Sequence, residues 1–352
     1  MKRIFRLGAF AGLMMAFLGV QAAETANAAD LYTIKGVHVD VTAASASEAR
    51  TIAQARGQKD ALNDLMRRLT LVSDWSRLPN VPDNAVQDAV RGFQVASEKA
   101  SSTRYIADLN VSFRPDAVRN LLKRNNILFG ETQAKAALLV PIYRKGDKEA
   151  FWDDSNPWRD AVVARDLDNA MTPLLLPLGD VQEFGLLTSM QAVNGDQQAI
   201  KNLGQRYGAD DVVVAIASSN DSGTSVSLTI NRYGPNGGEP LKRTYQSLDE
   251  AAAGLLAVLG EQWKQDTIVE PGAQAQLTAA VFFSGLDQWE AIRKGLASTP
   301  LVNGLQVEGI TATGAEVQVS YRGTPEKLAL SLAQANVVLA KTADESWTLQ
   351  AR

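Results

Sequence analysis

The sequence contains no cysteine and a single histidine among its 352 residues, and both shortages exclude chemistry. Without a thiol there is no disulfide framework, thiolate nucleophile, iron–sulfur ligation or acylated lipoprotein cysteine. His38 is the only imidazole, so a multi-histidine metal site is excluded, as is a Ser/His/Asp triad built away from that position.

Long apolar runs and nucleotide-binding loops are also missing. After the N-terminus the longest apolar run is residues 251–260, which falls short of the roughly 18 residues of a membrane helix. We therefore expect no transmembrane segment in the mature chain. No G-x-x-x-x-G-K-[ST], G-x-G-x-x-G or G-x-S-x-G string occurs. The sequence predicts no cofactor and no catalytic residue.

The N-terminus has the pattern of a secretory signal peptide. Residues 2–6 carry three positive charges, and residues 7–20 are apolar but too short to span a bilayer comfortably. Small-residue cleavage sites occur at residues 20–22 and 26–28, and we favour the second, which gives a mature chain beginning near Ala29. The expected localisation is periplasmic. The alternative is an uncleaved N-terminal anchor.

The charge balance of the mature chain is acidic. Removal of residues 1–28 takes away three basic residues and one acidic residue, which changes the net charge from −4 to −6. Nucleic acid is disfavoured as a partner, because phosphate binding relies on a basic surface. Broad adhesion to anionic lipid is disfavoured for the same reason.

Hydrophobic periodicity predicts a signal peptide and three small domains of α/β and α+β class: residues 1–28, 29–130, 131–270 and 271–352. The order expected in the first domain is β-α-α-β-α. A capping box at Ser45 and Glu48 starts its long helix. A second helix is expected to carry Val86, Ala89, Val90 and Phe93, and a strand follows over residues 105–113, in which apolar and polar residues alternate.

The middle domain is expected to form a mixed, mostly parallel sheet with helices, because strands and helices alternate along it. The predicted elements are strands at 136–143, 174–178 and 212–217, helices at about 157–170 and 184–207 with a break near 194–195, an antiparallel hairpin turning at 234–238, and a linker at 266–276. The last domain has the β-α-β-β-α-β order of a ferredoxin-like sandwich.

Several of these segments together resemble a bacterial family called domain of unknown function 2066. They are the helix with Ala49, Arg50, Gly57 and Leu65, the strand from Tyr105 to Phe113, and the segment from Trp152 to Trp158. The resemblance implies an exported envelope protein without assigned catalytic residues. At the level of fold, the first two domains are also similar to modules of periplasmic flagellar-ring and Tol-system proteins, an analogy that favours a scaffold or adaptor.

Candidate ligand-binding residues lie in loops that follow the strands of the middle domain. In open α/β sheets ligands bind beyond the carboxyl ends of parallel strands, and three loops leave such ends, at 144–156, 178–183 and 218–223. The residues that they and the next helix supply are Trp152, Asp153, Asp154, Trp158, Asp180, Glu183 and Asp221. The carboxylates suit a hard cation or acid/base chemistry, and the indoles suit stacking on a sugar or peptide. The alternative is that the tryptophans fix the loop to the core while the aspartates are solvated or cap helices.

Three hypotheses of function follow. The leading one is a non-enzymatic binding or assembly module of the cell envelope, whose partners are envelope proteins. The second is a carboxylate-dependent hydrolase or cation-dependent glycan binder that uses Asp153, Asp154 and Asp180. The third is a carrier of lipid or a small solute, which requires a deep apolar cavity.

Overall fold

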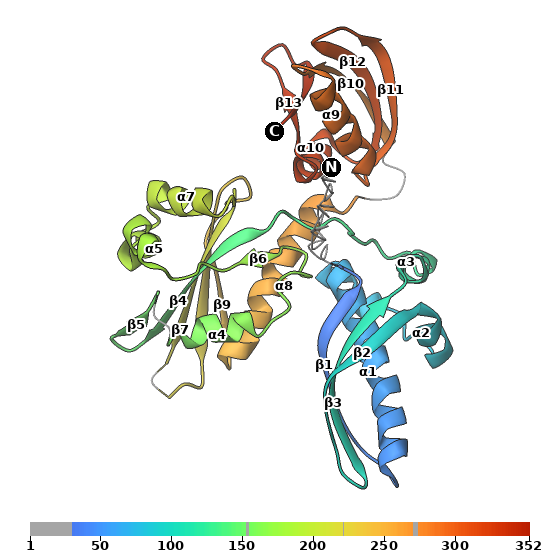
Figure 1. The fold of residues 1–352 in the computed structure, drawn as a ribbon, viewed down its shortest axis with the longest axis vertical. Coiled ribbons are helices and arrows are strands. Elements are labelled where there is room, and N and C mark those ends of the chain that lie inside the picture. The colour runs from blue at the N-terminus through green and yellow to red at the C-terminus, as the bar shows by residue number, and fades with distance from the viewer. Residues whose placement is uncertain (1–29, 153–154, 221, 270–273) are drawn as a thin grey trace, which may run out of the picture. The chain divides into compact units, whose positions relative to one another are not determined.

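The computed structural model describes residues 30–152, 155–220, 222–269 and 274–352. In this part the chain forms three sheets with helices packed on them, and both parallel and antiparallel strand pairs occur (Figure 1). The predicted mixture of α/β and α+β structure is confirmed. Leu31–Arg352 forms one compact unit, and the division into three domains stays a prediction.

Two sequence expectations concern the N-terminus and membrane helices. The predicted signal peptide, residues 1–28, lies outside the described residues. In the described part of the chain, no helix combines the length and apolar composition that crossing a bilayer requires.

The N-terminal sheet has the strand order β1-β3-β2, and both of its strand pairs are antiparallel. Its elements are β1 (Thr33–Thr42), α1 (Ala46–Leu69), the short 3-10 helix η1 (Val72–Arg77), α2 (Asp83–Ala89), β2 (Val90–Ala100), β3 (Arg104–Phe113) and α3 (Pro115–Arg124). The pairing of β1 with β3 shifts between Ile34 and Val37, where Gly36 takes a φ of +71°, so β1 has a β-bulge at this point.

Helix α1 lies along one face of this sheet, and small side chains let it come close. Its N-cap is the predicted one, with the Glu48 amide donating to Ser45 Oγ at 3.2 Å. Ala49, Ala53 and Gly57 recur at four-residue spacing on the buried face. A Cβ at Gly57 would lie 2.6 Å from Leu109 Cδ1 and 2.9 Å from Val39 Cγ1, so a larger residue would force these buried side chains or the helix to move.

The second predicted helix is shorter than expected, which corrects the β-α-α-β-α order. α2 ends at Ala89, and Val90 begins strand β2, in which Phe93 pairs with Val111 and Val95 with Leu109. The apolar positions matched a helical period, but β-branched and aromatic residues around Gly92 favour an extended strand once a partner such as β3 is available.

The middle sheet is built around β4 and β7, which are buried on both faces through most of their length. Its elements are β4 (Ala137–Lys145), β5 (Lys148–Ala150), α4 (Pro157–Val163), β6 (Leu174–Leu175), α5 (Val181–Leu186), α6 (Ser189–Asn194), α7 (Gln197–Arg206), β7 (Val212–Ser219), β8 (Val226–Tyr233), β9 (Leu241–Tyr245) and α8 (Leu248–Thr267). The strand order is β5-β4-β7-β8-β9, with β6 also paired to β4.

The sheet contains parallel and antiparallel strand pairs, as predicted, but fewer of the pairs are parallel than expected. β4 is parallel to β7 and β6, whereas the pairs β4–β5, β7–β8 and β8–β9 are antiparallel. Short turns join the antiparallel neighbours, and only antiparallel strands can be joined in that way.

Several boundaries in this region differ from the predicted ones. The helix expected over 157–170 ends at Val163, and the strand expected over 174–178 has two residues. The helical stretch expected over 184–207 is three helices, because Asp180, Thr188 and Asp196 each cap a new one. The predicted break is present, since Gly195 takes a φ of +72° and ends α6.

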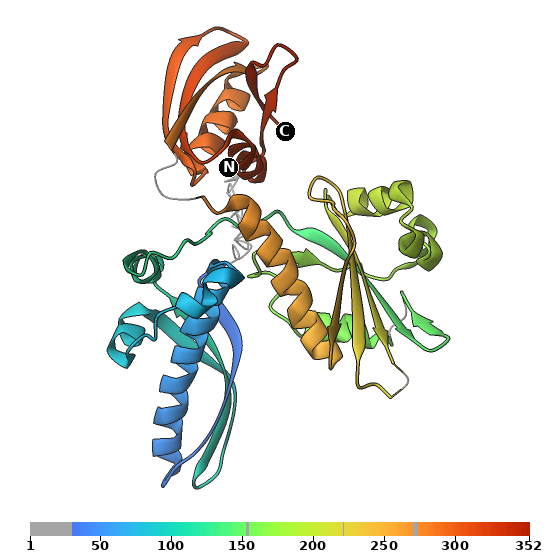
Figure 2. The same ribbon diagram turned by 180° about the vertical axis from the view of Figure 1, so that it is seen from behind.

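Helices cover both faces of the middle sheet. α4 and α8 pack on the face that buries Leu139, and α5, α6 and α7 pack on the face that buries Leu138 (Figures 1 and 2). α8 extends to Thr267, into the segment 266–276 expected to be a linker. Its last turns carry Trp263 into the core of the N-terminal sheet.

The C-terminal sheet has the strand order β11-β12-β10-β14-β13. Its elements are β10 (Gln274–Phe282), α9 (Leu286–Ser298), β11 (Val302–Ile310), β12 (Gly314–Arg322), α10 (Pro325–Gln334), β13 (Val337–Lys341) and β14 (Trp347–Ala351). β12 is inserted antiparallel between β10 and β11, which is the split pattern of a ferredoxin-like sheet. One further strand, β14, lies between β10 and β13, and α9 and α10 cover one face (Figure 2).

The close contact at Gly57 makes a stability prediction. Gly57→Val should lower the free energy of unfolding by about 2 kcal/mol, because the new methyl groups overlap Leu109 and Val39 and push α1 away from the sheet. Gly185→Val is the matched control, since the position is helical but exposed with open space around it, and its effect should stay within about 0.5 kcal/mol. Urea unfolding followed by circular dichroism measures both, and equal effects would contradict the close packing of α1.

Candidate functional site

Two of the three predicted loops leave the same edge of the middle sheet. Lys145 at the end of β4 pairs with Ser219 at the end of β7, so loops 144–156 and 218–223 start side by side. β6 pairs only with the first two residues of β4, and loop 178–183 therefore lies further back, next to Pro141 and Trp152. The expectation that all three loops share one edge is corrected, because β6 is too short to reach it.

Trp158 is a core residue. Its side chain is fully buried, and its indole Nε1 donates to the carbonyl of Ala215 in β7 at 3.1 Å. The preceding Asn156 is also buried and caps α4, accepting from the amides of Trp158 and Arg159 at 3.1 Å each. The position of Trp158 corresponds to the structural alternative, in which this indole fixes the loop to the core.

The predicted carboxylates that the structure describes have structural contacts. Asp180 caps α5 and forms an ion pair with Arg206 of α7 at 2.6 Å. Asp153, Asp154 and Asp221 lie outside the described residues. Among the described residues, no group of three or more His, Cys, Asp or Glu side chains is arranged to hold a metal ion.

Glu183 holds loop 178–180 in one conformation. Its side chain is fully buried, and its carboxylate accepts from the backbone amides of Leu178 at 3.3 Å, Gly179 at 2.5 Å and Asp180 at 3.2 Å. The hydroxyl of Tyr207 donates to the same carboxylate and accepts from the Leu178 amide at 2.9 Å. Burial is the main reason that the pKa of Tyr207 is raised, and the hydrogen bond to Glu183 adds to the effect. The loop is therefore fixed by a buried carboxyl group that accepts several hydrogen bonds.

This fixed loop and helix α5, which follows it, display apolar side chains. Leu178 is 74% exposed, Val181 86% and Phe184 54%, and the Phe184 ring lies 6.3 Å from the half-buried ring of Trp152. Trp152 in turn donates its indole N–H to the carbonyl of Leu187 at 3.1 Å. We call Trp152, Leu178, Val181 and Phe184 the Trp152 patch.

The described carboxylates that neighbour the Trp152 patch are engaged in contacts within the protein. Glu183, which precedes Phe184, is buried and accepts hydrogen bonds from backbone amides, and Asp180 forms an ion pair with Arg206. Contiguous exposed apolar side chains around an aromatic residue are typical of surfaces that contact another molecule. A preorganised loop lowers the entropy lost on binding.

The structure gives two of the predicted carboxylates contacts within the protein. Sequence reasoning named Trp152, Asp180 and Glu183 as possible ligands of a cation or sugar, whereas the structure uses both carboxylates to hold the loop. The signal for this role was available, because Asp180 and Glu183 have the spacing of a capping box, and the box is present. Tyr207 and Arg206 had no sequence signal that connected them with residue 183.

Comparison with protein families gives a match for the N-terminal part of the chain. Residues 26–130 match the model described as Domain of unknown function (DUF8605), which spans the N-terminal sheet with α1, α2 and α3. The resemblance to domain of unknown function 2066 is corrected by this match. No curated protein matches the chain significantly. The matched family is itself of unknown function, so it transfers no activity to this chain.

The Glu183 contacts predict a specific loss of stability. Glu183→Gln should lower the free energy of unfolding by about 2 kcal/mol. One carboxylate oxygen becomes an NH₂ group, which cannot accept a hydrogen bond, so a backbone N–H that now donates to Glu183 is left buried without an acceptor. The exposed Glu308 serves as control, and Glu308→Gln should change little. Chemical unfolding gives both values, and a small effect at Glu183 would contradict its role in holding the loop.

The raised pKa of Tyr207 predicts a dependence of stability on alkaline pH. A tyrosine with a raised pKa in the folded state stabilises the fold fully below its ordinary pKa of about 10 and loses that contribution as the pH rises through the higher value. Between about pH 9 and pH 11 the free energy of unfolding of the wild type should therefore fall more steeply than that of Tyr207→Phe. Urea unfolding at each pH measures the difference, to which the other tyrosines contribute equally in both proteins.

Proposed function

We propose that this protein is exported to the periplasm and acts there as a non-enzymatic binding or assembly module, with an envelope protein as its partner. The observation that carries the proposal is the Trp152 patch, in which exposed Leu178 stands on the loop held by buried Glu183, and exposed Val181 and Phe184 stand on α5, which follows it. Export rests on the sequence, namely on the basic residues 2–6, the apolar residues 7–20 and the small residues that follow.

The chemistry of the patch favours a protein partner over a lipid surface. Its four side chains are apolar, and the mature chain has a net charge of −6, which opposes adsorption to anionic membranes. An apolar surface with an aromatic centre and a rim of ion-paired side chains such as Asp180–Arg206 is the usual composition of a protein–protein interface. The proposed partner therefore presents an apolar surface of its own.

Export makes the first test. Protein recovered from the periplasmic fraction of its native host should begin near Ala29 when its N-terminus is read by mass spectrometry, because signal peptidase cleaves after small residues such as those at 26–28. A chain that keeps Met1 and is recovered from the cytoplasmic fraction would overturn the periplasmic proposal.

The second test concerns the Trp152 patch. The double variant Leu178→Ser/Phe184→Ser should lose most of a partner that the wild type captures reproducibly after cross-linking in the periplasm, because hydroxyl side chains remove the apolar contact area. Quantitative mass spectrometry of the cross-linked complex measures the recovery.

A matched pair of exposed apolar residues provides the control. Leu286 is 74% exposed and Ile310 55%, which are close to the values of Leu178 and Phe184, and both lie in the C-terminal region. Leu286→Ser/Ile310→Ser should leave recovery of the partner unchanged. Equal losses in the two double variants would mean that general surface hydrophobicity, and not the Trp152 patch, retains the partner.

A further inference from the structure

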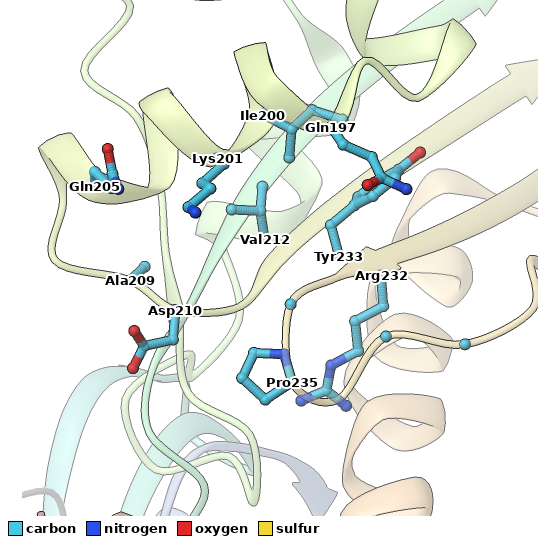
Figure 3. Close-up of a pocket in the computed structure, with 13 residues that line it drawn as sticks. Gln197, Ile200, Lys201, Gln205, Ala209, Asp210, Val212, Arg232, Tyr233 and Pro235 are labelled. Carbon is cyan, nitrogen blue, oxygen red and sulfur yellow. The ribbon is translucent and has the colours of Figure 1, made fainter. Parts of the chain in front are cut away.

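A second hollow of the middle sheet shares no residue with the Trp152 patch. It has a volume of about 680 Å³, with α7 as one wall and the end of β8 and the following glycine-rich turn as the other (Figure 3). Gln197, Lys201 and Gln205 line it from α7, spaced four residues apart on one face of the helix. The volume lies within the range of pockets that hold small organic ligands.

The walls of this pocket are fixed by close packing. A Cβ at Gly204 of α7 would lie 2.8 Å from the carbonyl of Ala209 and 2.9 Å from Val212, so the helix sits directly against the start of β7. Gly234 begins the opposite turn with a φ of +120°, and a Cβ there would lie 2.3 Å from the carbonyl of Asp210. Both walls are therefore held by close backbone contacts at Gly204 and Gly234, and these contacts fix the shape of the pocket.

A buried ion pair holds the turn. Arg232 is about nine-tenths buried, and its Nη2 lies 3.1 Å from Asp211 Oδ2. Asp211 also accepts from the backbone amide of Asn236 at 3.2 Å and from the Asn236 side chain. Arg232 and Asp211 neutralise each other, so this pair shapes the pocket without giving it a net charge.

Lys201 gives the pocket a positive charge that no described carboxylate pairs with. Asp210, the carboxylate that lines the pocket, forms an ion pair with Arg352 at 2.9 Å. Lys201 is exposed, and among the described residues none forms a hydrogen bond or ion pair with its ammonium group. The pocket therefore carries one positive charge that no carboxylate of the described chain balances. Apolar atoms of Ala209 and Pro235 complete the lining.

We propose that this pocket binds a small organic anion with an apolar body, whose negative group pairs with Lys201 and whose body lies against the glycine-rich turn. Gly237 and Gly238 expose backbone to the pocket and carry no side chain, so a flat molecule can approach closely. The two glutamines of α7 offer amide donors on either side of the charge. This activity is separate from partner binding, because the two surfaces have no residue in common.

Two fluorescent probes of similar shape test the proposal on the full mature chain. Anilinonaphthalene sulfonate has an anionic group and an apolar body, and phenylnaphthylamine has the same body without the charge. The wild type should bind the sulfonate saturably with one site, and Lys201→Gln should weaken that binding about fivefold while leaving phenylnaphthylamine unchanged. Lys201→Glu should weaken the sulfonate further through repulsion. The exposed Lys294→Gln is the control for lysine loss elsewhere and should change neither probe.

A blocking variant locates the binding. Gly238 has open space around it, so Gly238→Phe should fill the pocket without strain and weaken both probes about tenfold or more. Gly309→Phe adds the same ring at an open, exposed position of β11 and should have no effect. Far-UV circular dichroism confirms that each variant folds, and the exposed Lys201 variants test the site even where Gly238→Phe does not fold.

The outcomes are distinct from those of the patch. Sulfonate binding that persists in Gly238→Phe but is lost in Leu178→Ser/Phe184→Ser would place the probe on the Trp152 patch and overturn the pocket proposal. Equal weakening of both probes by Lys201→Gln would overturn the preference for an anion. Absence of saturable binding would overturn the site altogether, and none of these results bears on capture of the envelope partner.

Discussion

Burial of β4 and β7 on both faces is the constraint on which the middle of this protein depends. The two strands pair over Leu138–Lys145 and Val212–Ser219, and most of these residues are apolar. Because their side chains project from both faces of the sheet, helices must cover both faces. α4 and α8 cover one face and α5, α6 and α7 the other. Both proposed binding surfaces lie where the helices of the second face meet the rest of the sheet.

On that second face the covering helices are short, and polar side chains fix their positions. α5 begins at Asp180, and Glu183 in its first turn holds the preceding loop by three backbone amides. α7 is held against β7 at Gly204, where no side chain could fit. A buried carboxylate and a missing side chain thus position the Trp152 patch and the proposed anion pocket, which lowers the entropy that binding would cost.

Much of the fold was predictable because its signals are local. The N-cap at Ser45, the alternation in β3 and the break at Gly195 are each set by residues within a few positions of one another. The helix expected to include Phe93 was wrong, because Val86, Ala89, Val90 and Phe93 happen to fit a helical period. The strand that forms instead depends on pairing of β2 with β3, which joins residues as far apart as Val90 and Phe113, 23 positions along the chain. The number of parallel strand pairs in the middle sheet also depends on pairing between residues far apart in the sequence, such as β4 with β7.

The candidate site divides in the same way. The sequence by itself predicted the region, from the rule that ligands bind beyond the carboxyl ends of parallel strands, and it determined the acidic charge and the export-like pattern at the N-terminus. Only the tertiary structure decided that Trp158 is buried, that Glu183 holds a loop and that Lys201 is unbalanced. These properties depend on contacts between residues far apart in the sequence, such as Trp158 with Ala215 and Glu183 with Tyr207. Such contacts follow from the packing of whole helices and strands and not from spacing along the chain.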